Sequence, residues 1–357
     1  MSSLVSRIRI AAASILCAAA VTHAADRGHL DTPMLPEGCG SCHVGHGQSD
    51  QPMLAHSEER FCYQCHGADD EIARMQRAGR LSPVADPVRV EDVFDKPYRH
   101  PVERTGDHEP GERLPSLAAS KTDRHAECVD CHSPHSRPTV LGREGVTGFT
   151  VTGSRMDEAT TEYEVCLKCH SDEFGVEGRD KNLRLVMGPG ARSSHPVAVP
   201  FTGVSSPSLT GEAAGVRQMK CSDCHGNDDP NGAQGPHGSN YPALLKDNYD
   251  TSPVADESDF AYALCYRCHD RNSLFRNESF PLHQEHIVGN PVKGIPGTSC
   301  ATCHNAHGSL EASHLIDFNP TVASSTQFGP ARFVDLGDKH GECYVLCHSK
   351  SHSPARY

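Results

Sequence analysis

The stretch Cys39-Gly-Ser-Cys42-His43 decides the fold, because its pattern recurs along the chain. Seven segments read Cys-x-x-Cys-His, and an eighth is one residue longer. The other copies are Cys62-Tyr-Gln-Cys65-His66, Cys128-Val-Asp-Cys131-His132, Cys166-Leu-Lys-Cys169-His170, Cys221-Ser-Asp-Cys224-His225, Cys265-Tyr-Arg-Cys268-His269, Cys300-Ala-Thr-Cys303-His304 and Cys343-Tyr-Val-Leu-Cys347-His348. Residues three and four apart share one face of a helical turn. The two thiols and the imidazole of one copy can therefore meet a single ligand.

This spacing is typical of covalent attachment of c-type haem. The two thiols add to the haem vinyl groups, and the adjacent histidine ligates the iron. Zinc sites and redox dithiols also use Cys-x-x-Cys pairs. Neither requires a histidine directly after the second cysteine, and here a histidine follows in all eight copies. We therefore expect eight covalently attached haem c groups with iron.

The cysteine count supports this interpretation. Of 17 cysteines, only Cys17 lies outside the motifs, so no motif-independent thiol remains downstream for a disulfide or a catalytic nucleophile. The eighth motif is less regular, because the extra residue changes the separation of Cys343 and Cys347. His348 keeps its place after the second cysteine, so haem is expected there too.

The first 24 residues are expected to be a signal peptide. Arg7 and Arg9 precede the short apolar run 10–21, and Thr22-His23-Ala24 offers a cleavage site after Ala24. The run is short for a membrane anchor, and the lipoprotein alternative at Cys17 is weakened by the bulky Leu16. No later stretch is apolar enough for a transmembrane helix. An exported protein, periplasmic or at the cell surface and not integral to a membrane, is expected.

Charge and composition narrow the class further. The formal net charge is −13, and removing the two leader arginines lowers it to about −15, which argues against nucleic acid as a partner. Such charge suits a carrier that meets cationic patches on other redox proteins, or serves solubility alone. With no Trp, 31 Gly and 25 Pro, the chain has little apolar surface to offset ordering entropy. Haems are therefore expected to form the core.

The histidines form a second repeat around the motifs. A "near" histidine follows the first motif of each pair, and a "far" histidine follows the second. The near histidines are His46, His135, His237 and His307, with His237 delayed by an insertion, and the far histidines are His100, His195, His286 and His352. These eight match the number of distal iron positions, so they are the predicted distal ligands.

The pairing of these ligands is predicted from spacing. His43 and His46 lie three apart and should point the same way, whereas the two axial positions of one iron lie on opposite faces. A near histidine should then complete a neighbouring haem, most simply the second of its own unit, and the far histidine the first. The remaining histidines are surplus, and five stay open as alternative ligands. Those five are His29, His56, His125, His283 and His340, and the other surplus residues are His108 and His314.

These observations predict a mostly irregular fold with short α-helices that carry the motifs, haems as the core and little sheet. Residues 25–357 should form one domain of four dihaem units, at about 29–108, 125–200, 221–290 and 300–352. A short helix is expected at 71–77, and a small hairpin is expected from 148–153 and the segment before it.

On its paired motifs, His-x-x-His extensions and His-Pro-Val phrases, the chain resembles the multihaem c-type cytochromes with doubled C-x-x-C-H repeats. The resemblance covers about residues 30 to 352. It implies low-spin, bis-His haems spaced closely enough for electrons to pass between them, in bacterial periplasmic or extracellular respiration. The implied partners are a membrane quinol oxidase, an outer-membrane cytochrome or porin conduit, or further copies in a filament.

Two functions remain in competition. An electron-transfer protein needs every iron closed by two ligands and no catalytic residues. An octahaem oxidoreductase of small nitrogen or sulfur compounds needs one open iron and a substrate cavity. The 333 residues after the leader give about 42 per motif, which leaves little chain for a cavity. Electron transfer is therefore the predicted function, with the oxidoreductase as the alternative.

Overall fold

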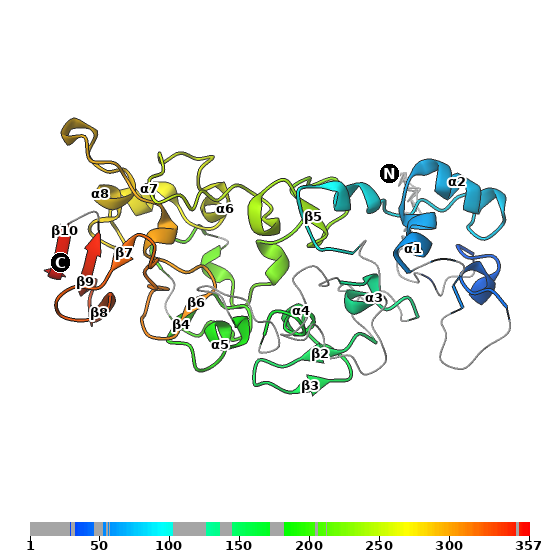
Figure 1. The fold of residues 1–357 in the computed structure, drawn as a ribbon, viewed down its shortest axis with the longest axis horizontal. Coiled ribbons are helices and arrows are strands. Elements are labelled where there is room, and N and C mark those ends of the chain that lie inside the picture. The colour runs from blue at the N-terminus through cyan, green and yellow to red at the C-terminus, as the bar shows by residue number, and fades with distance from the viewer. Residues whose placement is uncertain are drawn as a thin grey trace, which may run out of the picture.

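The computed structural model describes residues 29, 33–45, 53, 54, 56, 58–102, 126–135, 145–171, 182–203, 206–211, 213–347 and 350–357. This part of the chain forms an elongated body, with the first helices at one end and the last strands at the other (Figure 1). The predicted leader, His46, His108, His125 and His348 lie outside the described residues.

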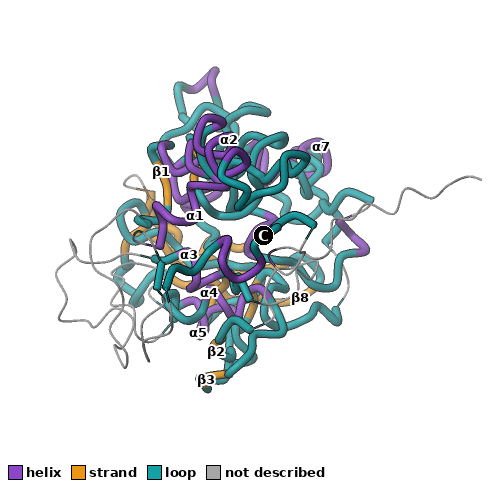
Figure 2. Tube along the Cα trace, turned by 90° about the vertical axis from the view of Figure 1, so that its right-hand side faces the viewer, coloured by secondary structure: helices purple, strands orange, loops and turns teal. Residues whose placement is uncertain are grey.

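Short helices and turns joined by long loops make up most of the body (Figure 2). The α-helices are α1 Glu58–His66, α2 Asp69–Arg77, α3 Cys128–Cys131, α4 Glu162–Cys166, α5 Leu183–Met187, α6 Ala263–Tyr266, α7 Arg271–Phe275 and α8 His283–Ile287. The 3-10 helices are η2 Gly38–Ser41, η3 Glu91–Asp95, η4 Ala213–Gly215, η5 Cys221–Asp223, η6 Pro242–Leu244, η7 Pro291–Lys293 and η8 Cys300–Thr302. The predicted irregular fold with short helices is confirmed.

Helix α2 shows why a short segment of this chain becomes helical. Ile72 and Met75 lie three apart and are buried against Leu35 and Leu81. Three acidic residues occupy its first turn and Arg74 and Arg77 its last, which complements the helix dipole. Gly79, at φ +78°, follows its end. The helix predicted at 71–77 is confirmed.

Strands are short except near the C-terminus. They are β1 Tyr98–Arg99, β2 Gly148–Phe149, β3 Arg155–Met156, β4 Ser193–Ser194, β5 Gly238–Ser239, β6 Gly308–Ser309, β7 Ala323–Ser324, β8 Arg332–Gly337, β9 His340–Cys347 and β10 Lys350–Arg356. Strand β9 pairs antiparallel with β10, and also with β8 and β7. The predicted hairpin exists, but β2 pairs with β3, which follows it, and not with a preceding segment.

Two strand pairs join distant parts of the chain. Strand β1 pairs with β5, and β4 pairs with β6, each over two residues and antiparallel. A Cβ on Gly238 would lie 2.0 Å from the carbonyl oxygen of Val93, and one on Gly308 would lie 2.1 Å from that of Val186. Only glycine allows this approach. Predicted units one and three, and likewise two and four, therefore meet at equivalent junctions.

Buried apolar side chains form small separate clusters instead of one core. The cluster of Val186, Met187, Val197 and Ala198 is typical, with four buried members. Clusters of this size bury little apolar surface against the entropy of ordering the loops around them. The arrangement agrees with the expectation that protein packing alone does not hold this fold.

In the part of the chain that the structure describes, no helix is both long enough and apolar enough to cross a bilayer.

Candidate haem-binding sites

Six motifs are wound into one turn by the same hydrogen bond. The backbone N–H of the motif histidine donates to the carbonyl of the first cysteine, four residues earlier. The donor–acceptor distances are 2.8 Å for His43–Cys39, 2.9 Å for His132–Cys128, 3.0 Å for His170–Cys166, 2.9 Å for His225–Cys221, 3.0 Å for His269–Cys265 and 2.9 Å for His304–Cys300. The second motif lies within α1. All seven regular motifs therefore lie in helical turns, which suits attachment to one porphyrin.

The eighth motif departs from the expectation that short helices carry the motifs. Cys343 and Cys347 both lie in β9, where Cys343 pairs with Phe333 and Ala355. Four steps of a strand separate their Cα atoms by about 13 Å, far more than one helical turn does. The extra residue breaks the three-residue spacing, and Tyr344 and Val345 favour a strand. In this conformation Cys343 and Cys347 do not fit one porphyrin as the other pairs do.

Five predicted distal histidines lie opposite motif histidines. Their ring centroids are 5.8 Å apart for His43–His135, 6.0 Å for His132–His237, 6.0 Å for His225–His307, 6.4 Å for His100–His170 and 6.5 Å for His195–His269. A metal–imidazole bond is about 2 Å long, so one metal between two imidazoles holds their centroids about 6 Å apart. The histidine pairs therefore fit bis-axial ligation of one iron.

The pairing within units that spacing predicted is wrong. His135 was expected opposite His170 of its own unit, but it lies opposite His43 of the unit before. The far histidines face the following unit instead: His100 of unit one lies opposite His170 of unit two. The chain path, and not the local spacing, decides which histidines meet. Every pair found between predicted ligands joins two different units.

Two histidines that the sequence treated as surplus also face motif histidines. The ring centroids of His29 and His66 are 5.9 Å apart, and those of His283 and His304 are 6.4 Å apart. His283 stands three residues before His286, the spacing of a motif histidine and its near histidine, and that signal could have found it. Nothing around His29 in the sequence marks it. The seven facing pairs are numbered sites 1 to 7 here, after the order of their motifs.

Backbone carbonyls orient several of these imidazoles. The Nδ1 atom of His66 donates to Val88 O at 2.9 Å, that of His225 to Ala243 O at 2.8 Å and that of His304 to His314 O at 2.9 Å. A donated Nδ1 proton leaves the lone pair on Nε2 for a metal. Desolvation by burial lowers the pKa of His237, His269 and His304 to about 4. These side chains are neutral at pH 7, as ligation requires.

The sites follow one another in space in the order of the sequence. Burial is the largest cause of each lowered histidine pKa, and the charge of a histidine in the next site lowers it further. For example, His66 at site 2 lowers the pKa of His132 at site 3. The same coupling joins His29 to His135, His237 to His100, His170 to His225, His195 to His307 and His269 to His304. The seven sites thus form a row in which each adjoins the next, and the motif helices α1, α3, α4 and α6 follow one another along the elongated body (Figure 1).

Motif thiols contact each other at the boundaries between units two and three and between units three and four. A hydrogen bond with Cys221 raises the pKa of Cys166, and one with Cys265 raises that of Cys300. Each contact joins the first cysteines of consecutive motifs, at sites 4 and 5 and at sites 6 and 7. None of the sixteen motif cysteines forms a disulfide.

The other predicted ligands lie near the C-terminal sheet. The Nδ1 atom of His286 donates to Leu282 O at 2.8 Å. Burial and then the charge of His286 lower the pKa of His352, which places the two side chains near each other. His286 and His352 both remain candidates for the eighth haem, because their partner His348 is not described. Within the described residues, metal-ligating side chains form no group of three or more.

The remaining surplus histidines that the structure describes have surface positions. His56, His314 and His340 are exposed. The Nε2 atom of His314 lies 3.1 Å from Asp335 Oδ2, and the Nδ1 atom of His340 donates to Tyr357 O at 2.8 Å. These contacts agree with their prediction as surplus residues.

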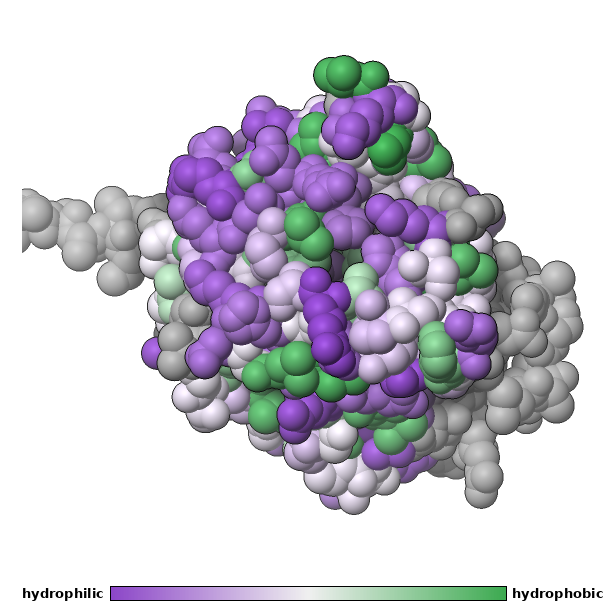
Figure 3. Space-filling view, turned by 90° about the vertical axis from the view of Figure 1, so that its left-hand side faces the viewer, coloured by the Kyte–Doolittle hydropathy of each residue, from purple (hydrophilic) through white to green (hydrophobic). Residues whose placement is uncertain are grey.

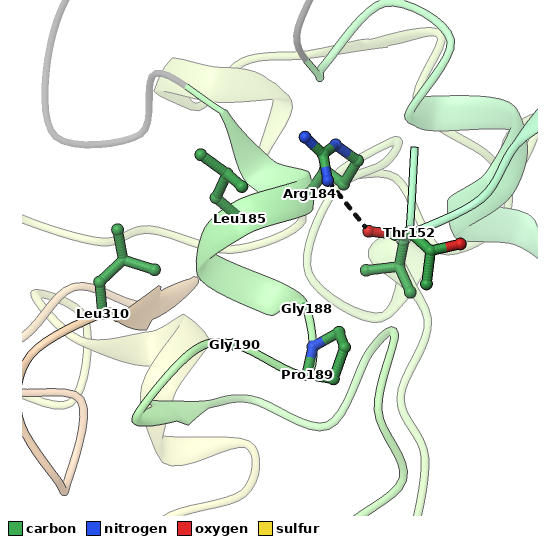
Figure 4. Close-up of a pocket in the computed structure, with 8 residues that line it drawn as sticks. Thr152, Arg184, Leu185, Gly188, Pro189, Gly190 and Leu310 are labelled. Carbon is green, nitrogen blue, oxygen red and sulfur yellow. Dashed lines mark hydrogen bonds between the residues drawn. The ribbon is translucent and has the colours of Figure 1, made fainter. Parts of the chain in front are cut away.

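A pocket of about 410 Å³ lies between α5 and the β2–β3 turn (Figure 4). Arg184 points toward the turn and donates to Val151 O at 3.4 Å, while Leu185 and Leu310 line the other side. Its lining includes no histidine, cysteine or carboxylate. The pocket therefore offers no acid–base pair.

Comparison with known protein families finds a match to two parts of the chain. A family model described as the doubled CXXCH motif matches residues 32–71 and 214–274, which hold motifs one and two and motifs five and six. No curated protein and no solved structure matches the chain. The family match and the geometry of the motifs support placing the chain with the multihaem c-type cytochromes that bind haem c covalently.

Proposed function

We propose that the chain is an octahaem c-type cytochrome that carries electrons along a row of bis-His haems in bacterial periplasmic or extracellular respiration. The observation that carries this proposal is the set of seven motif histidines that each face a second histidine at the distance one iron spans. Haem c supplies reversible one-electron transfer at its iron.

The residues of the chain have three tasks in this function. The paired cysteines would attach the group, and the motif histidine and the facing histidine would both ligate its iron. Two imidazoles on one iron leave no position for a substrate. The continuous coupling from site 1 to site 7 suits transfer along the row, since each site adjoins the next.

The surface fits a carrier that meets other redox proteins. The end of the molecule with the C-terminal sheet is covered mostly by hydrophilic side chains, with hydrophobic ones scattered among them (Figure 3). We propose export to the periplasm or the cell surface. The proposed partners are a membrane quinol oxidase, an outer-membrane cytochrome or porin conduit, or further copies in a filament.

One observation keeps the octahaem oxidoreductase as a second candidate. The extended Cys343 and Cys347 make the eighth motif unlike the other seven, so it is the place where an open iron would occur. Acting on a small nitrogen or sulfur compound requires such an iron.

Low-temperature EPR of the oxidised holo-protein separates the two functions. Electron transfer predicts low-spin signals from all haems, unchanged by cyanide or nitrite. A high-spin signal of about one haem per chain that shifts when nitrite is added would instead support the oxidoreductase.

A further inference from the structure

Each interior unit receives ligands from both neighbours in a fixed pattern. Unit two takes His100 from unit one at site 4 and His237 from unit three at site 3. Unit three takes His195 from unit two at site 6 and His307 from unit four at site 5. A far histidine of the unit before and a near histidine of the unit after thus complete every interior unit. Sites 2 and 7, in the first and the last of the four units, are completed in another way.

One hydrogen bond marks the position of each far histidine. The Nδ1 atom of His100 donates to the carbonyl of Pro236, which directly precedes His237, at 2.5 Å. The Nδ1 atom of His195 donates to Ala306 O, directly before His307, also at 2.5 Å. The near and far ligands of one unit are therefore held together through the backbone.

His29 repeats this arrangement at the N-terminal end. The backbone carbonyl of Pro134, directly before His135, forms a hydrogen bond with His29. The ring of His29 faces His66, the second motif histidine of unit one, at 5.9 Å. His29 therefore occupies the position that a far histidine of a preceding unit would fill.

Helix α8 supplies the second histidine of site 7. Site 7 is completed by a histidine outside the near and far sets. His283 faces His304 at 6.4 Å, in the place of a near histidine. The ring of Phe280 packs on His283 at 5.1 Å and on Tyr357 at 4.7 Å, which fixes α8 against the C-terminal strand.

We propose that His29 and His283 are the axial ligands that complete the first and the last unit, at site 2 with His66 and at site 7 with His304. This inference rests on the proposed haem binding and deepens it. It gives defined structural roles to two histidines that the spacing left as surplus. It also predicts that units two and three complete none of their own irons.

The test uses full-length holo-protein carrying His29→Ala or His283→Ala. Each variant should gain about one high-spin haem per chain that binds carbon monoxide when reduced, because one axial position opens. His56→Ala is the matched control: like His29 it is exposed, but among the described residues it faces no motif histidine. It should keep the wild-type spectrum.

Two further measurements make every outcome informative. His29→Met and His283→Met should keep all haems low-spin and raise the potential of one, because methionine ligation raises a haem potential. Alanine variants that stay fully low-spin and bind no carbon monoxide would overturn the inference. A wild-type protein with no covalent haem by mass would instead overturn the proposed function.

Discussion

At the residue scale, backbone carbonyls that accept from Nδ1 orient the far histidines His100 and His195. His100 and His195 donate to carbonyls 136 and 111 residues away. The sequence predicted both residues as ligands from the His-Pro-Val phrase. It could not identify their partners, because a contact over such a separation depends on the chain path and not on local spacing.

Replacing His237 with methionine should raise the potential of one haem and leave the others unchanged. His237 faces His132 at 6.0 Å, and a thioether in its place stabilises the reduced iron. Spectroelectrochemical titration measures the change. His314→Met is the control, since His314 is exposed and pairs with Asp335. Equal titration curves for His237→Met and the wild type would rule out His237 as a ligand.

The ion pair of Lys96 and Asp228 is expected to make the free energy of unfolding depend on pH below pH 4. Their atoms lie 2.6 Å apart across the junction of units one and three. Burial raises the pKa of Asp228, but hydrogen bonds from Lys96 and Asn240 outweigh this and lower it to about 2. The stabilisation is thus complete above the ordinary pKa of about 4 and is lost as the pH falls toward 2.

Asp228→Asn should therefore lower the free energy of unfolding at pH 7 by about 1 kcal/mol. The difference from the wild type should shrink between pH 4 and pH 2, as Asp228 in the wild type becomes protonated. Thermal unfolding of the holo-proteins across this range measures it. A difference that is the same at pH 2 and pH 7 would show that the charge of Asp228 is not responsible.

At the element scale, motif spacing decides between turn and strand. Three-residue spacing allowed the helical turns of seven motifs to be predicted. The one extra residue in Cys343–Cys347, with Tyr344 and Val345 inside it, lies in β9 instead. The four-stranded sheet around β9 was not predicted, because its pairing depends on long-range register. The two-residue strand pairs are too short to leave a pattern in the sequence.

Gly308→Ala should separate His307 from His225 at site 5. The added Cβ would lie 2.1 Å from Val186 O, so β6 must move away from β4 and carry the adjacent His307 with it. We expect a high-spin fraction at one haem and a lower melting temperature. Gly190→Ala is the matched control, because a Cβ there meets nothing within 4 Å. Similar spectra and melting temperatures for both variants would contradict this role of the β4–β6 junction.

At the scale of the whole molecule, the haems are expected to be the core. The protein clusters are small and separate, and every site of units two and three is completed by a histidine from another unit. Four independent dihaem modules would not need this crossing. The sequence predicted the number of repeats and the reliance on haem, but the interlocking of the units emerges only from the fold.

The chain made without haem attachment should therefore be largely unfolded. Its binding energy for haem is part of its folding energy, as in other metal-dependent folds. Far-UV circular dichroism and size-exclusion chromatography should show little helix and an expanded chain. A compact haem-free chain with a cooperative thermal transition would show that the protein clusters suffice.

Locating the irons tests the central claim most directly. An anomalous diffraction map of the holo-protein at the iron edge would place every haem. We predict irons between His43 and His135, between His132 and His237 and between His225 and His307, arranged in sequence order along the body. An iron between His135 and His170, which belong to one unit but to different sites, would contradict the interlocked row.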